Sequence, residues 1–111
     1  MPSLRNSYEQ KALRHYRLRC YRILGTNVWV GGYEIDLVVR RGRALAFVEV
    51  KAKSGEGLGD PLEMVGPEKQ RRLRRAAEAW LAAHPEAAGL ETRFDVVAVR
   101  EGRVERVAQA F

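Results

Sequence analysis

One short stretch constrains the fold more than any other, because it has the pattern of a strand that is buried on both faces. The run Leu45-Ala46-Phe47-Val48 is apolar at every position, whereas a strand with one face in water alternates apolar and polar residues. A strand from Ala44 to Ala52 is therefore expected near the middle of a sheet. Glu49 and Lys51 lie in the same strand, and charges buried there are costly unless they have a partner or a function.

Turn and helix signals on either side of this strand predict the other elements. A helix is expected from about Leu4 to Cys20, where apolar residues recur every three to four positions, and Ser7 could cap a shorter version of it. A second helix is expected from Pro67 to about His84, because proline suits a first turn and Pro85 stops the helix. The other expected strands are Tyr21–Val30 with a bend or bulge at Gly25-Thr26-Asn27, Tyr33–Val39, Thr92–Val99 and Arg103–Val107.

The connections between these elements predict the topology. Short turns at Gly31-Gly32 and Arg41-Gly42-Arg43 make consecutive strands antiparallel, whereas the helical crossover into Thr92–Val99 allows parallel pairing. The sequence thus predicts a single α/β domain over residues 1–111, with a mixed central sheet flanked by helices. The glycine-rich stretch from Lys53 to Gly66 is expected to be a loop, and a loop of this length in a small domain is often functional.

The balance of charge favours a nucleic-acid partner. Lys and Arg number 20 against 14 Asp and Glu, for a net charge of +6, and phosphate is the natural partner of such a surface. Basic residues are concentrated on the second helix. They are Lys69, Arg71, Arg72, Arg74 and Arg75. The same helix could instead be a solvated basic face, or could dock an acidic partner protein.

Composition also excludes several classes of protein. No apolar run approaches the roughly 20 residues of a membrane-spanning helix, and the N-terminus lacks the apolar core of a signal peptide. No membrane partner and a cytoplasmic location are therefore expected. The single cysteine, Cys20, cannot form an internal disulfide, and with two distant histidines it makes no zinc site. A bound metal should have carboxylate ligands, which favours Mg²⁺ or Mn²⁺.

Acidic residues on the two middle strands are the candidates for chemistry. Because side chains alternate along a strand, Glu34 and Asp36 are expected to share one face of their strand, and Glu49 and Lys51 one face of the next. The hairpin sets these strands side by side, which brings Asp36 and Glu49 to about 5 Å apart. The residues expected on the opposite face of the first of these strands are Ile35, Leu37 and Val39.

This arrangement suits hydrolysis of a phosphodiester. Asp36 and Glu49 could bind one cation, with the carbonyl of Val50 as a third ligand. Lys51 could hold or deprotonate the attacking water and stabilise the developing negative charge. The alternative is a cross-strand salt bridge among Asp36, Glu49 and Lys51, without any metal.

The same motifs resemble a known nuclease signature. Asp36, followed after a hairpin by Glu49-Val50-Lys51, resembles the PD-(D/E)XK pattern. Nearly the whole chain is similar to the YraN-like family of small bacterial proteins regarded as endonucleases. The matching motifs are Gly32-Tyr33-Glu34-Ile35-Asp36-Leu37, Phe47-Val48-Glu49-Val50-Lys51, Lys69-Gln70-Arg71-Arg72-Leu73 and Arg93-Phe94-Asp95-Val96-Val97. Tyr33 is inserted where a glycine usually precedes the glutamate, and Cys20 stands where glycine is common.

The resemblance implies a restriction-endonuclease-like αβββαβ core, a divalent metal and a further metal ligand from the first helix, which by position is Glu9. It implies a metal-dependent endonuclease for structured or damaged DNA, with DNA favoured over RNA, acting as a homodimer or with a partner protein. Residues expected to contact phosphate or metal-bound water are Glu34, Lys53, Lys69, Gln70, Arg71, Arg72, Arg74 and Arg75. The alternatives are a non-catalytic nucleic-acid-binding module of the same fold and a basic protein-interaction module.

Other conspicuous residues are given structural roles. Asp95 is expected to be a hydrogen-bond or salt-bridge partner that stabilises the fold. Trp29, Trp80 and Phe94 are expected in the core rather than as platforms on which bases stack.

Overall fold

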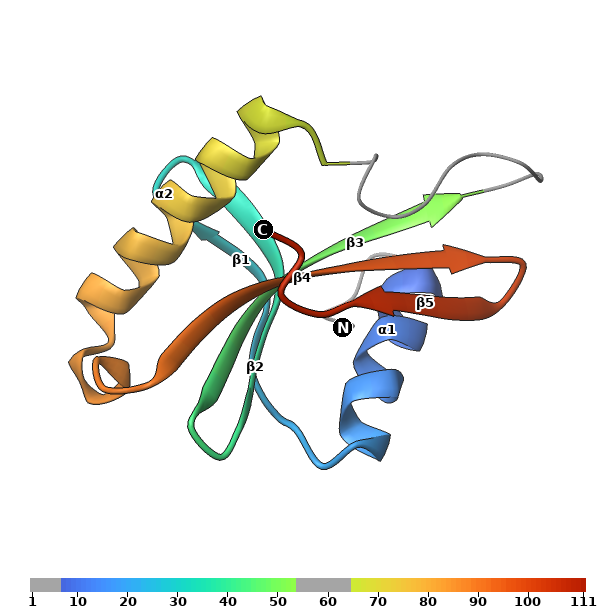
Figure 1. The fold of residues 1–111 in the computed structure, drawn as a ribbon, viewed down its shortest axis with the longest axis horizontal. Coiled ribbons are helices and arrows are strands. Elements are labelled where there is room, and N and C mark those ends of the chain that lie inside the picture. Colours follow the sequence, from blue (N-terminus) through green and yellow to red (C-terminus); the bar gives the residue numbers. More distant parts are fainter. Residues whose placement is uncertain (1–6, 54–64) are drawn as a thin grey trace.

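The computed structural model describes residues 7–53 and 65–111, which form a five-stranded mixed sheet with helices packed on it (Figure 1). The elements in chain order are α1 (Ser7–Leu18), β1 (Arg22–Val30), β2 (Tyr33–Arg41), β3 (Ala44–Lys53), α2 (Pro67–Ala83), the short 3-10 helix η2 (Pro85–Ala87), β4 (Glu91–Arg100) and β5 (Arg103–Val107). The expected order of elements is confirmed. Leu4 and most of the expected loop, residues 54–64, lie outside the described residues.

The strands follow one another across the sheet in the order β1-β2-β3-β4-β5. The pair β3 and β4 is parallel, as expected from the crossover through α2, and the other neighbouring strands are antiparallel (Figure 1). β3 is the middle strand, which agrees with its apolar character on both faces. None of the helices in the described ranges is long and apolar enough to cross a membrane.

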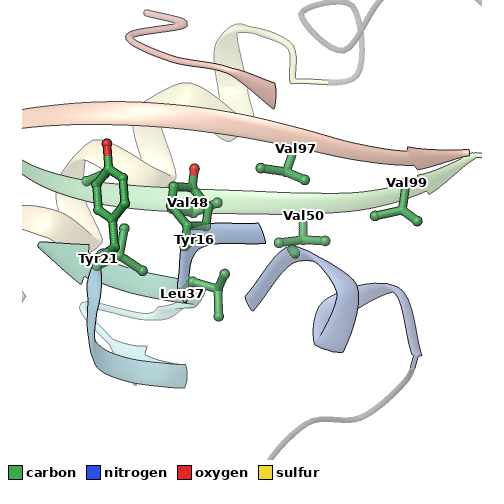
Figure 2. Close-up of a cluster of buried hydrophobic side chains, with 10 residues drawn as sticks. Tyr16, Tyr21, Leu37, Val48, Val50, Val97 and Val99 are labelled. Atoms are coloured by element: carbon green, nitrogen blue, oxygen red, sulfur yellow. The ribbon is translucent and has the colours of Figure 1, made fainter. Parts of the chain in front are cut away.

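Each face of the sheet has its own apolar cluster. On one face, Tyr16 of α1 packs with Val48 and Val50 of β3 and with Val97 of β4 (Figure 2). The other cluster joins Phe47 of β3 to α2 residues, including Leu73 and Trp80. The alternation along β3 therefore sends successive side chains to opposite helices, and this anchors both helices to the same strand.

The expected alternation in β2 is wrong. Ile35 belongs to the cluster under α2, whereas Leu37 and Val39 belong to the cluster under α1. The irregularity coincides with Asn27 on β1, which has a φ of 50° and lies between the paired positions Thr26↔Leu37 and Val28↔Ile35. The expected bulge in β1 is confirmed by a shift of register between Ile23 and Gly25.

Two turns fix how the helices meet the sheet. After α1, the N–H of Tyr21 donates to the carbonyl of Tyr16 at 3.1 Å and that of Cys20 to Arg17 at 3.0 Å, which is a Schellman turn with Cys20 in the left-handed conformation at a φ of 68°. Between β1 and β2, a Cβ on Gly31 would lie 3.0 Å from the Cα of Ala76. The absence of a side chain there lets α2 pack directly on the hairpin.

Of the three aromatic residues that were expected in the core, two are buried and one is exposed. Trp80 and Phe94 are buried in the cluster under α2, as expected. Trp29 was expected in the core, and this is wrong, because its exposed fraction is 75%. Its neighbours Val28 and Val30 pack toward the α2 cluster, so alternation along the edge strand turns Trp29 away from it.

Candidate functional site

A cleft of about 460 Å³ brings together residues from both helices and from the first three strands. Its lining residues are Tyr8, Glu9, Trp29, Gly32, Tyr33, Glu34, Asp36, Glu49, Val50, Lys51 and Arg72. The cleft therefore contains Asp36, Glu49 and Lys51, the residues that the sequence singled out for catalysis. It also contains Glu9, which the family resemblance added from the first helix.

Asp36 lies where the ladder between β2 and β3 ends. The paired positions run from Arg41↔Ala44 to Leu37↔Val48. One residue further along β2, the N–H of Val50 donates a 2.7 Å hydrogen bond to Oδ2 of Asp36. The carboxylate of Asp36 is thus the acceptor at this point, where a backbone carbonyl would be the acceptor in a continued ladder. This bond holds the Asp36 carboxyl beside the Glu49-Val50-Lys51 motif.

Glu49 is buried, with an exposed fraction of 4%, and its two oxygens have different environments. Oε2 lies 3.1 Å from Nζ of Lys51, two residues along the same strand. Oε1 is buried without a hydrogen-bond partner in the described part of the chain. An unsatisfied carboxylate oxygen inside a protein is costly, so Glu49 retains an unused capacity to bind a cation or a donor.

The carboxyl groups in the cleft repel one another. Burial and the nearby charges of Glu49 and Glu9 together raise the pKa of Asp36 to about 7, against the opposing effect of the hydrogen bond from Val50. Like charges that share a buried site favour a proton or a cation between them. A cation bound beside Asp36 would therefore favour its ionised form.

Two lysines from different elements meet beside these carboxylates. Burial lowers the pKa of Lys51, but the carboxylate of Glu49 at 3.1 Å favours the charged form and raises it. The contact with Lys51 lowers the pKa of Lys69, and burial lowers it further. Lys69 was expected to contact phosphate, and its closeness to Lys51 could not be read from the sequence.

Glu9 is positioned by a residue that the sequence analysis treated only as part of a bend. The Nδ2 of Asn27 donates a 3.1 Å hydrogen bond to Oε1 of Glu9, and Oδ1 of Asn27 is buried without a hydrogen-bond partner among residues 7–53 and 65–111. The signal that could have identified Asn27 is its tolerance of positive φ. Asn27 thus connects α1 to the irregular part of β1 at the edge of the cleft.

The other residues expected to contact phosphate or water do not gather in one place. Glu34 and Arg72 line the cleft, whereas Nε2 of Gln70 donates to the carbonyl of Val65 at 3.0 Å and so supports the start of α2.

The remaining basic residues are dispersed. Arg71 forms an ion pair with Glu68. Arg74 lies over the ring of Phe94 at 5.1 Å, and Arg75 is exposed on α2. The side chain of Lys53 is outside the described part of the structure. The basic helix therefore presents Arg72 to the cleft, places Lys69 against Lys51 and directs Arg74 to the Phe94 side.

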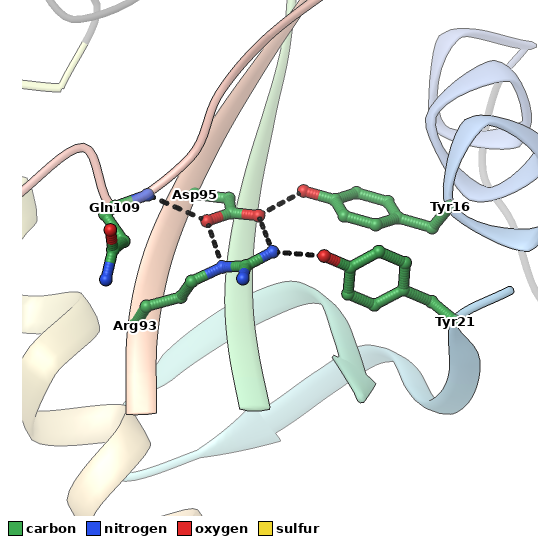
Figure 3. A network of polar contacts seen from close by, with 5 residues as sticks. All are labelled: Tyr16, Tyr21, Arg93, Asp95 and Gln109. Carbon is green, nitrogen blue, oxygen red and sulfur yellow. Dashed lines mark hydrogen bonds and ion pairs between the residues drawn. The ribbon is translucent and has the colours of Figure 1, made fainter. Parts of the chain in front are cut away.

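Asp95 has the structural role that the sequence predicted (Figure 3). Its exposed fraction is 0%. Its carboxylate accepts hydrogen bonds from the hydroxyl of Tyr16 at 2.7 Å, from Nε of Arg93 at 3.0 Å and from the N–H of Gln109 at 3.1 Å. Arg93 also donates to the hydroxyl of Tyr21 at 2.5 Å. This network joins α1 to β4 and to the C-terminal segment.

The carboxylates in the cleft fit a divalent cation by their chemistry. Within the described ranges, no three His, Cys, Asp or Glu side chains form a ready metal-binding group. The unpaired Oε1 of Glu49 and the raised pKa of Asp36 are nevertheless features that a cation would relieve. Oxygen ligands of this kind are those that Mg²⁺ and Mn²⁺ prefer.

Comparison with known proteins agrees with the motifs in the cleft. The model of the uncharacterised protein family UPF0102, the YraN-like family, matches residues 8–99. A UPF0102 protein of Methylorubrum extorquens is 46% identical over 100 residues, which cover 90% of this chain and 77% of the relative. A UPF0102 protein of Shewanella amazonensis is 39% identical over 103 residues, which cover 93% of this chain and 94% of the relative. The chain therefore belongs to the UPF0102 family.

Proposed function

We propose that this protein is a metal-dependent endonuclease of the PD-(D/E)XK type, with a restriction-endonuclease-like fold, that hydrolyses phosphodiester bonds in structured or damaged DNA. The observation that carries the proposal is the convergence of Asp36, Glu49 and Lys51, with Glu9, in one cleft. The order of elements, one helix, three antiparallel strands, a second helix and a parallel strand, supports the same assignment.

Each residue of the cleft has a part in the proposed chemistry. Asp36 and Glu49 would hold Mg²⁺ or Mn²⁺, with Glu9 and the carbonyl of Val50 as further oxygen donors. The cation, when bound, lowers the pKa of a coordinated water and neutralises charge on the phosphate. Lys51, kept charged by Glu49, places an ammonium group where negative charge develops on the phosphoryl oxygens.

Positive charge around the cleft would hold the DNA backbone. Lys69 lies against Lys51, Arg72 lines the cleft, and the chain as a whole carries a net charge of +6. Contacts of this kind bind phosphate without reading sequence, and they weaken as salt is added. Recognition of shape is thus favoured over recognition of sequence. Cutting both strands of a duplex would need a second active site, supplied by a homodimer or a partner protein.

A non-catalytic nucleic-acid-binding module of the same fold is the second candidate. The 3.1 Å ion pair between Lys51 and Glu49 favours it, because that pair neutralises both side chains without a metal. The lack of a ready three-ligand group in the described ranges points the same way. The buried, unpaired Oε1 of Glu49 favours the endonuclease instead.

Metal binding and cleavage by matched variants would test the proposal. Mn²⁺ is titrated by calorimetry into the parent, into an Asp36→Asn, Glu49→Gln double variant, and into a Glu91→Gln control. Glu91 is a suitable control because it pairs with Arg43 on the exposed surface. The same proteins are then incubated with Mn²⁺ and with branched, nicked, single-stranded and blunt duplex DNA.

The endonuclease proposal predicts that the parent and the control bind Mn²⁺ and cut DNA. The double variant should lose at least about 100-fold in cleavage rate, because a catalytic cation contributes several kcal/mol to stabilising the transition state. If the parent binds DNA in a salt-dependent way but neither binds Mn²⁺ nor cuts any of the DNA forms, the non-catalytic module is the better account.

A further inference from the structure

We infer that Trp29 is a platform on which an unpaired nucleobase stacks, so that the cleft takes a nucleic-acid strand with a base out of the duplex stack. The inference relies on the proposed function for the nature of the site. It adds a feature of the substrate that the motif residues do not specify, namely single-stranded or distorted structure beside the point of cleavage.

The position of Trp29 is unusual for so large an apolar side chain. It lies near the end of the edge strand β1, paired with Glu34 of β2, and 75% of it is exposed. Trp80, the other tryptophan, is 4% exposed. A buried indole would contribute strongly to folding, so the exposure of Trp29 does not serve the stability of the described fold.

The surroundings of Trp29 match the chemistry of a nucleotide. Trp29 lines the same cleft as Lys51 and Arg72, together with Tyr8 and Tyr33. Proteins that bind single strands combine positive charge along the backbone with aromatic faces for the bases. One cleft here offers both, and it also holds the carboxylates of the proposed metal site.

The lining of the cleft is of mixed charge, with the carboxylates of Glu9, Glu34, Asp36 and Glu49 beside the basic side chains of Lys51 and Arg72. The basic side chains can pair with a phosphate, and the indole of Trp29 offers an apolar face to a base. A nucleic-acid strand brings both groups to the cleft, and a cation held by the carboxylates, as in the proposed function, would reduce their repulsion of the phosphate.

Binding of intact and abasic strands by Trp29 variants would test the inference. Fluorescence anisotropy is measured in EDTA, which prevents cleavage, with a labelled single-stranded oligonucleotide, the same oligonucleotide carrying abasic sites, and a blunt duplex. The variants are Trp29→Ala and Trp29→Phe. Leu18→Ala is the matched control, because Leu18 is 69% exposed and lines a different pocket.

Stacking on Trp29 predicts a specific pattern of losses. Trp29→Ala should weaken binding of the intact single strand roughly 5- to 150-fold, the range for loss of one stacked base. Trp29→Phe should retain most of the affinity, and Leu18→Ala should behave as the parent. The parent should bind the abasic strand more weakly than the intact strand. The abasic strand should have the same affinity for Trp29→Ala as for the parent, because it has no base to stack.

Two results would overturn the inference. One is an equal loss by Trp29→Ala for the intact and the abasic strand. The other is a parent that self-associates in sedimentation while Trp29→Ala does not, which would make Trp29 a contact between copies. The measurement needs no catalysis, so its outcome is separate from that of the proposed function. If the parent cuts DNA but its binding does not depend on Trp29, the endonuclease proposal stands and the stacking inference fails. If binding depends on Trp29 but no DNA is cut, the stacking inference stands and the endonuclease proposal fails.

Discussion

Asp95 and Glu49 are buried carboxylates on neighbouring strands, and the protein surrounds them in opposite ways. They belong to successive pairs of one ladder, Val48↔Asp95 and Glu49↔Val96. Asp95 accepts hydrogen bonds from Tyr16, Arg93 and Gln109, whereas Oε1 of Glu49 has no partner in the described part of the chain. A carboxylate that serves the fold is fully paired by the fold itself. One that retains an unused oxygen is a candidate for binding something else.

The largest effect on stability is expected at Asp95. Asp95→Ala should lower the free energy of unfolding by about 3–5 kcal/mol, because it leaves the guanidinium of Arg93 buried beside an empty site. Glu49→Gln should change it far less, since the carboxylate that it removes is already incompletely paired. Urea unfolding of both variants measures the difference. Equal losses in the two variants would contradict the division between a structural and a functional carboxylate.

The pH dependence of stability should separate Asp36 from the structural network. The folded state keeps a proton on Asp36 up to a pKa of about 7, against an ordinary value of 3.8. This contribution to stability is complete below pH 3.8 and is lost as the pH rises through 7, by at most about 4 kcal/mol.

Asp36→Asn should therefore lack this loss, and Mn²⁺ should offset it in the parent, because a cation can replace the proton. Thermal unfolding from pH 4 to pH 8, with and without Mn²⁺, measures both effects. Parallel pH profiles for the parent and Asp36→Asn would show that Asp36 does not hold a proton in the folded state.

A smaller effect is expected at Asn27. Asn27→Gly removes the hydrogen bond to Glu9 but tolerates the φ of 50°. Loss of a group that orients a metal ligand typically weakens metal binding about 10- to 100-fold, so Mn²⁺ affinity should fall within that range while the fold persists. Calorimetry measures the affinity, and Asn27→Asp, which cannot donate from the same atom, is a second test. Unchanged affinity in both variants would exclude Glu9 as a metal ligand.

The smallest effect is expected at Cys20, where a substitution should change the stability of the fold but not the affinity for Mn²⁺. Cys20→Gly relieves a left-handed residue in the turn that leads from Tyr16 to Tyr21, so it should raise stability by about 1 kcal/mol. The melting temperature should rise by about 4 °C or more. Mn²⁺ binding should stay the same, because the turn supports the Asp95 network rather than the cleft. A change in Mn²⁺ affinity would show that the two regions are coupled.

The local patterns in the sequence gave most of the fold. The apolar run at Leu45-Ala46-Phe47-Val48 correctly predicted a central strand, and the helical crossover correctly predicted the parallel pairing of β3 with β4. The hairpin predicted that Asp36 and Glu49 would be neighbours, and the structure brings both into one cleft. These predictions succeeded because the period of a strand and the length of a turn are properties of consecutive residues.

Other features depended on contacts between distant segments. Ile35 and Leu37 lie on opposite faces of the sheet although they are two residues apart, next to the part of β1 where Asn27 has a positive φ. The contact of Lys69 with Lys51 joins α2 to β3, and Gly31 lets α2 pack closely on the hairpin between β1 and β2.

By itself, the sequence determined the order of the elements, the mixed sheet and the two strands that carry Asp36, Glu49 and Lys51, because hydrophobic period and turn chemistry are local. Only the tertiary structure decided which buried carboxylate is fully paired and which tryptophan remains exposed. Asp95 and Glu49 have similar apolar neighbours in the sequence, yet only Asp95 is fully hydrogen-bonded within the described part of the fold. Trp29 and Val28 are adjacent in one strand, yet only Val28 packs against the core. The surroundings of these side chains are made by residues far along the chain, such as Tyr16 and Gln109 for Asp95.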